Sequence, residues 1–345
     1  MKKPIKITHS KPTINIYWIL TDFCNFKCNY CPDFLHSGNF ATGKTQGFPS
    51  YSDIVIFMDK LKEMISDGTH LNLQFGGGEP TLHPNFLDII KYMNAENVYL
   101  GVTTNGSRSK EWWEETLPFL DNVTISLHPE FTKIDKVNDL AKSIVESDTS
   151  LLFNLSCDPD RWDRVLELYN NIDDSLRRFV TPKVLNYIGN SEKKNFTYTD
   201  EQTTWIKNHI ANPSSSRGFI NSVIHFDDGS TENLVLSKIT INNWNEFQGW
   251  KCKVASQSLM INFAGKVNAG ICNAKSLGRL TEFKIDLGAR STARRHCAQG
   301  AQRPTAEPRR HAAMGPDSGQ TGLAGPRLAQ RIWRAGLELG TKTPV

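Results

Sequence analysis

Residues 21–32 read TDFCNFKCNYCP, and this segment places Cys24, Cys28 and Cys31 within a stretch of eight residues. The chain holds seven cysteines in 345 residues, whereas disulfide frameworks spread cysteine pairs along short secreted chains. The apolar run at 14–20 is short and has no cleavage site of small residues after it, so we expect a buried strand and no signal peptide. The clustered cysteines therefore indicate metal ligation in a reducing compartment, which predicts a cytoplasmic protein.

Three thiolates on one short loop can bind three irons of a cubane [4Fe-4S] cluster, because cysteine thiolates are the usual ligands of such clusters. The fourth iron then has no protein ligand, and chemistry on a bound molecule requires such an open site. Electron-transfer clusters are normally closed by four cysteines. A structural zinc site is the alternative, but zinc takes four tetrahedral ligands, and the chain has no second CxxC pair.

Short β-rich runs alternate with helical patterns from residue 13 to about residue 210. The expected strands cover 13–20, 71–75, 97–103, 122–127, 151–155 and 178–182. The first expected helix is capped by Ser52 and ended by Gly68, and the others cover 86–94, 110–117, 132–146, 160–169 and 197–210. Six strand–helix repeats predict a parallel sheet with right-handed crossovers. A closed barrel needs eight repeats, so the predicted α/β fold is a partial (β/α)6 TIM-like barrel.

Glycine and polar residues stand at the carboxyl ends of these strands, where site residues of barrel-like folds lie. The second strand runs into GGGEP at 76–80, whose glycines permit close backbone approach to a ligand; Glu79 could compensate an ammonium group. The candidates on the following strands are Thr104, Asn105, Ser126 and Asn154. His128 could act as an acid or base near neutrality, but we favour a structural role for it.

The cysteine segment and the glycine turn together resemble the radical S-adenosylmethionine (SAM) superfamily, whose signature is CxxxCxΦC with an aromatic residue at Φ. Tyr30 occupies that position, and the resemblance implies that it contacts the adenine of SAM. The Gly-Gly-Glu motif then holds the methionyl amine. The full set of SAM contacts that the resemblance implies is Tyr30, Gly77, Gly78, Glu79, Thr104, Asn105, Ser126 and Asn154.

The activity implied by this resemblance is reductive cleavage of SAM at the [4Fe-4S] cluster held by the three cysteines. The product is a 5′-deoxyadenosyl radical, which abstracts hydrogen from a peptide or small-molecule substrate. An electron donor such as flavodoxin or ferredoxin is the expected partner. Two alternatives stay open, a non-catalytic iron–sulfur protein in electron transfer or sensing and a zinc-stabilised binding module.

The charge of the chain is unevenly distributed. The net charge is +4, but residues after 285 carry +6, so the preceding residues carry −2. A nucleic-acid footprint should lie on the folded part, so no nucleic-acid partner is expected. No apolar run is long enough to span a bilayer, so no membrane partner is expected either. Residues 286–345 are rich in Ala, Gly, Pro and Arg, which predicts a disordered or non-native tail.

Two β pairs are expected before that tail, 219–225 with 232–236 and 258–263 with 266–271. This region resembles the start of the twitch or SPASM extension of the same superfamily, which binds an auxiliary cluster. Cys252 and Cys272 would then be ligands of a second [4Fe-4S] cluster, left incomplete because only Cys297 follows. The predicted division is an N-terminal extension at 1–12, a radical SAM core at 13–215, a twitch/SPASM-like extension at 216–285 and the tail at 286–345.

Overall fold

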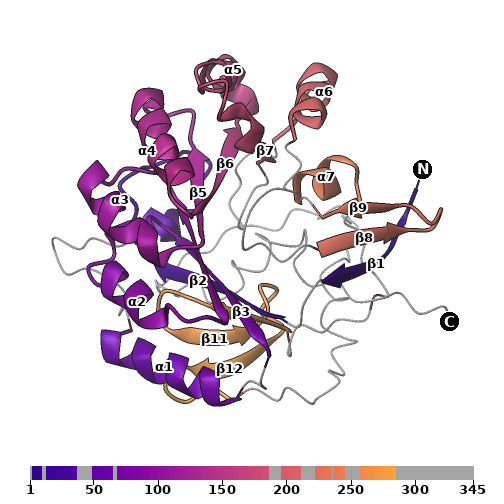
Figure 1. Ribbon diagram of the computed structural model, residues 1–345. Helices are drawn as coiled ribbons and strands as arrows, with labels where there is room; N and C mark the ends of the chain where they lie inside the picture. Colours follow the sequence, from indigo (N-terminus) through magenta and orange to yellow (C-terminus); the bar gives the residue numbers. More distant parts are fainter. Residues whose placement is uncertain are drawn as a thin grey trace, which may run out of the picture.

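The structure is a computed structural model that describes residues 2–9, 13–36, 49–64, 68–185, 196–210, 222–234, 236–244, 250 and 257–284. Its strands form two sheets, and the smaller lies to the right of the larger in Figure 1. The larger sheet has nine strands in the order β12-β11-β10-β2-β3-β4-β5-β6-β7, and the smaller has the order β1-β8-β9. No helix within the described ranges is both long and apolar enough to cross a membrane.

Six strands of the larger sheet run parallel, each beside the next in the chain. They are β2 Thr13–Thr21, β3 His70–Gly77, β4 Val98–Thr104, β5 Asn122–Leu127, β6 Ser150–Cys157 and β7 Val180–Val184. Parallel neighbours require a crossover connection, which a helix usually provides. Six such strands fall short of the eight of a closed barrel, so the predicted partial (β/α)6 barrel is confirmed.

The crossover helices lie along the outer side of this sheet (Figure 1). They are α1 Tyr51–Met64, α2 Phe86–Met93, α3 Lys110–Thr116, α4 Ile134–Glu146 and α5 Trp162–Asn170, and α6 Asp200–His209 follows the last parallel strand. The prediction that Ser52 caps the first helix is wrong. Ser50 precedes the helix, and its Oγ accepts a hydrogen bond from the Asp53 amide at 3.1 Å, while Asp53 Oδ2 accepts one from the Ser50 amide. This reciprocal arrangement satisfies backbone donors at the helix start.

The two faces of the sheet differ because side chains alternate along each strand. In β2 the residues Ile14, Ile16, Trp18 and Leu20 belong to the main core between sheet and helices. The residues between them face the concave side, where Asn15 accepts a hydrogen bond from the Asn72 side chain of β3 at 2.9 Å. The outer face thus holds the main core. The other face carries polar residues such as Asn15 and a small apolar cluster in which Ile19 packs with Met260 and Ile271.

The last described strands join the barrel sheet. β10 Ser258–Ile261 and β11 Lys266–Ala269 form the expected antiparallel pair, and β12 Lys275–Arg279, which the sequence pattern did not indicate, follows. β10 also pairs in parallel with β2, so these strands extend the nine-stranded sheet. Phe283 packs on Phe57 of α1, with ring centroids 4.7 Å apart.

The smaller sheet joins distant parts of the chain. β1 Pro4–His9 lies antiparallel to β8 Ser222–Phe226, which pairs with β9 Thr231–Asn233 in the expected hairpin. The short helix α7 Leu236–Ile241 follows. Strands from both ends of the described chain therefore complete sheets with partners far away in sequence, while the division into four regions remains a prediction.

Candidate active site

The three clustered cysteines lie on the loop that leaves the carboxyl end of β2. All three are free thiols; Cys28 is buried, and Cys24 and Cys31 are half-buried. Burial raises the pKa of Cys24 and of Cys28 to about 12 and that of Cys31 to about 11. Negative charge on the Cys31 thiol would further raise the pKa of each of the other two. A metal cation would compensate the cost of ionising them together.

The glycine turn after β3 is packed against the beginning of this loop. The Gly78 amide donates to the Thr21 carbonyl at 2.9 Å, and the Glu79 amide donates to the Phe23 carbonyl at 2.7 Å. A Cβ on Gly78 would lie 2.1 Å from the Phe23 carbonyl oxygen, and Gly77 has φ +116°. Glycine is therefore required here for the approach of the cysteine loop itself, a role that differs from the expected approach of a ligand.

Glu79 is buried, and its carboxylate accepts hydrogen bonds from the chain itself. Oε1 accepts from the Thr81 amide, the Thr81 hydroxyl and the Thr104 hydroxyl, and Oε2 accepts from the Asn105 amide at 2.6 Å. Burial raises the pKa of Glu79, and these hydrogen bonds act in the opposite direction. The carboxylate thus ties the carboxyl end of β3 to that of β4.

Asn105 continues this connection to the cysteine loop. Its side-chain amide donates to Asn25 Oδ1 at 2.8 Å and lies 3.9 Å from Cys24 Sγ, while its Oδ1 accepts from the Ser107 amide. The predicted candidates Glu79, Thr104 and Asn105 are therefore brought together with Cys24 in one network of hydrogen bonds.

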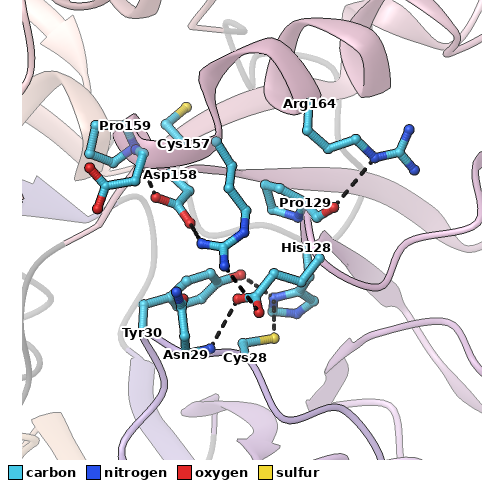
Figure 2. A network of polar contacts seen from close by, with 12 residues as sticks. Cys28, Asn29, Tyr30, His128, Pro129, Cys157, Asp158, Pro159 and Arg164 are labelled. Carbon is cyan, nitrogen blue, oxygen red and sulfur yellow. Dashed lines mark hydrogen bonds and ion pairs between the residues drawn. The ribbon is translucent and has the colours of Figure 1, made fainter.

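Tyr30 and His128 connect the other side of the loop to β5. The Tyr30 hydroxyl lies 2.6 Å from His128 Nδ1, and the two rings stack with centroids 6.0 Å apart. The same Nδ1 lies 3.4 Å from Cys28 Sγ (Figure 2). Burial lowers the pKa of His128 to about 3, so the ring is neutral near pH 7. A neutral, enclosed ring of this kind agrees with the structural role that we favoured for His128.

A second set of contacts holds the loop from outside (Figure 2). The Asn29 amide donates to Glu130 Oε1 at 3.0 Å. Arg161 pairs with Glu130 at 3.7 Å and with the buried Asp158 at 2.9 Å. These residues follow β5 and β6, and the sequence alone did not single them out. We call Asn29, Glu130, Asp158 and Arg161 the loop clamp.

Ser126 and Asn154 are neighbours in the sheet, because the β5–β6 register places them side by side. Asn154 in turn is opposite Thr181 of β7. Both predicted positions alternate with core residues such as Ile125, Phe153 and Leu155, so they face the concave side.

Only one of the two predicted ligands of the auxiliary cluster lies within the described residues. Cys272 lies after β11 and is half-buried, whereas Cys252 lies outside the described residues. Cys157 is buried in the core, as expected for a small core residue rather than a ligand.

Residues 18–139 match the family described as the radical SAM superfamily, and the chain therefore contains a radical SAM domain. The cofactors of this superfamily are a [4Fe-4S] cluster and SAM. Among the described residues, no three His, Cys, Asp or Glu side chains meet closely enough to hold one metal ion. A cubane spreads three thiolates over three irons, so the free thiols of this loop fit a cluster better than a single zinc ion.

Several curated proteins resemble the chain. The GTP 3′,8-cyclase of Pasteurella multocida (strain Pm70) is 28% identical over 159 residues, which are 41% of this chain and 45% of that protein. The GTP 3′,8-cyclase of Shewanella denitrificans (strain OS217) is 34% identical over 117 residues, 32% of each chain. The chain thus matches less than half the length of these relatives.

The fold also resembles solved structures. Native anSMEcpe with bound AdoMet superimposes with a TM-score of 0.55 at 16% identity, covering 82% of each chain. The same protein with AdoMet and the Cp18Cys peptide gives 0.54 at 15% identity, covering 82% of this chain and 81% of that one. At identity this low, the superposition shows a shared fold and no more.

Proposed function

We propose that this chain is a radical SAM enzyme. The observation that carries the proposal is the joining of the three-cysteine loop to the Gly-Gly-Glu turn by two backbone hydrogen bonds. When bound there, the cluster and SAM supply a 5′-deoxyadenosyl radical, formed by one-electron reductive cleavage of SAM and consumed by hydrogen abstraction from substrate.

In this proposal the residues of the chain bind and orient the cofactors. Cys24, Cys28 and Cys31 would hold the cluster and leave one iron without a protein ligand. Glu79, through Thr104 and Asn105, joins the strand ends that would bind the methionyl group. The predicted SAM contacts at Tyr30, Gly77, Gly78, Ser126 and Asn154 belong to the same carboxyl-end surface.

The proposed function also requires a substrate and an electron donor. A peptide or a small molecule is the proposed substrate, and the relatives named GTP 3′,8-cyclase and the anSMEcpe structure with a peptide illustrate both classes. A flavodoxin or ferredoxin in a reducing cytoplasm would deliver the electron. Cys252 and Cys272 remain proposed ligands of a second cluster in a twitch/SPASM-like extension.

The test is release of 5′-deoxyadenosine. Anaerobically reconstituted protein with dithionite and SAM should form it, as measured by liquid chromatography. Cys28→Ala should abolish formation, while Cys157→Ala, which alters a buried cysteine away from the loop, should retain it. A full cluster whose EPR spectrum ignores added SAM, without 5′-deoxyadenosine, would instead indicate a non-catalytic iron–sulfur protein.

A further inference from the structure

The six parallel strands carry very little charge. Lys183 is the only Lys, Arg, Asp or Glu in strands β2 to β7. It lies one residue before the carboxyl end of β7, opposite Ser156 of β6. Val180 and Pro182, which alternate with it, are buried, so Lys183 faces the concave side. Lys183 is therefore the one charged side chain that these strands contribute to the carboxyl end of the barrel, beside the site residues.

The surroundings of Lys183 are those of a partly enclosed ammonium group. Much of the surface of Lys183 is accessible to solvent. Desolvation of the ammonium group by the surrounding protein nevertheless lowers the pKa of Lys183, and the Cys31 thiol acts in the opposite direction. Lys183 also lowers the pKa of His128. No carboxylate of the described residues forms an ion pair with it within 4.0 Å. A cation that is partly desolvated and has no ion-pair partner favours binding of an anion.

Lys183 lies on a strand that carries none of the predicted SAM contacts, which are on the cysteine loop and on β3, β4, β5 and β6. Neighbouring strands are about 4.8 Å apart, so β7 is about 14 Å across the sheet from β4, whose end carries Thr104 and Asn105. β7 lies directly beside β6, whose Asn154 is opposite Thr181. Lys183 is nevertheless close enough to the cysteine loop to influence Cys31 electrostatically, as required of a group that holds substrate beside the cofactors.

We propose that Lys183 binds a carboxylate or phosphate group of the substrate at the carboxyl end of β7. The inference rests on the proposed function and deepens it, because it restricts the substrate to molecules that carry an oxyanion. The ammonium group would donate charge-assisted hydrogen bonds to that oxyanion and so orient the substrate over the cluster loop. Lys183 is thus a substrate-binding and specificity-determining residue.

Calorimetric titration of the reconstituted, SAM-bound protein with inorganic pyrophosphate and with citrate tests the proposal. We expect at least one of these anions to bind, with a dissociation constant raised about fivefold or more by Lys183→Met and changed less than about threefold by Lys183→Arg. Lys136→Met is the matched control, since Lys136 is an exposed lysine of α4, and it should leave binding unchanged. Affinity for SAM and the midpoint potential of the cluster should be unchanged in every variant.

Three results would overturn the proposal. One is that neither anion binds in a Lys183-dependent way. Another is that Lys183→Met weakens binding of SAM, which would assign the residue to the cofactor carboxylate. The last is a shift of the midpoint potential without a change in anion binding. Formation of 5′-deoxyadenosine is measured separately, so a failure of the radical SAM function would be distinguished from a failure of the anion site.

Discussion

Gly78 carries a packing requirement that a sequence motif does not reveal. Its backbone is so close to Phe23 that any side chain would collide with the carbonyl oxygen of the cysteine loop. The two hydrogen bonds from Gly78 and Glu79 to that loop depend on the same approach. Substitution of this glycine therefore displaces the loop as well as the turn.

Gly78→Ala should destabilise the protein by about 3 kcal/mol, because a Cβ 2.1 Å from a backbone oxygen forces backbone movement. Urea unfolding measures the loss, and iron bound after reconstitution should fall with it. Gly229→Ala is the control: Gly229 has φ +82° but open space around it, so only the left-handed backbone penalty of about 1 kcal/mol applies. Equal losses in the two variants would contradict the steric explanation.

At the scale of elements, the cluster loop is held between strand ends rather than by its own conformation. Glu79 and Asn105 hold its first half from β3 and β4. The loop clamp holds its second half from the segments after β5 and β6. These contacts attach both halves of the loop to the sheet, which favours a preorganised set of ligands.

Arg161→Met should accelerate loss of the cluster about threefold to tenfold, because Glu130 loses its cationic partner and holds Asn29 less firmly. Bleaching of the visible absorbance of the cluster in the presence of a chelator measures the rate. Arg177→Met is the matched control, since Arg177 has the same exposure of 36% and an Asp partner at the same spacing. Identical rates in both variants would show that the clamp does not hold the loop.

At the scale of the whole molecule, the described C-terminal strands are part of the barrel sheet. β10 covers the edge of β2, and the buried residues Leu259, Ile261 and Val267 belong to the main core. Without them, β2 would become an exposed edge with unpaired backbone groups. The strand that leads into the cysteine loop thus depends on residues more than 230 positions away.

A chain ending at residue 285 should keep the thermal unfolding midpoint of the full chain within about 2 °C, as expected for a tail that contributes no core. A chain ending at residue 256 should lose about 10 °C or more, because several buried side chains and three strand pairings are removed. Differential scanning calorimetry distinguishes the two. A large loss on removing 286–345 would contradict the view of that segment as disordered or non-native.

Much of the barrel could be predicted because its signals are local. All six parallel strands and their helices were expected close to their observed bounds, since apolar alternation and glycine turns mark them in the sequence. β12 and the pairing of β1 with β8 were not expected. Strand pairing between distant segments leaves little trace in local sequence, so edge positions could not be derived from it.

The three-cysteine loop, the Gly-Gly-Glu turn and the strands that lead into them could be predicted from the amino-acid sequence, because spacing and periodicity are properties of adjacent residues. The contacts between these residues became apparent only in the fold. In the fold, the Glu79 carboxylate accepts hydrogen bonds from Thr81, Thr104 and Asn105. Gly78 allows the cysteine loop to approach the turn closely. The fold also places Lys183 on the concave face, near the carboxyl end of β7. Hydrogen bonds, steric contacts and charge proximity act across space, and the sheet register that sets them is fixed only when the whole chain folds.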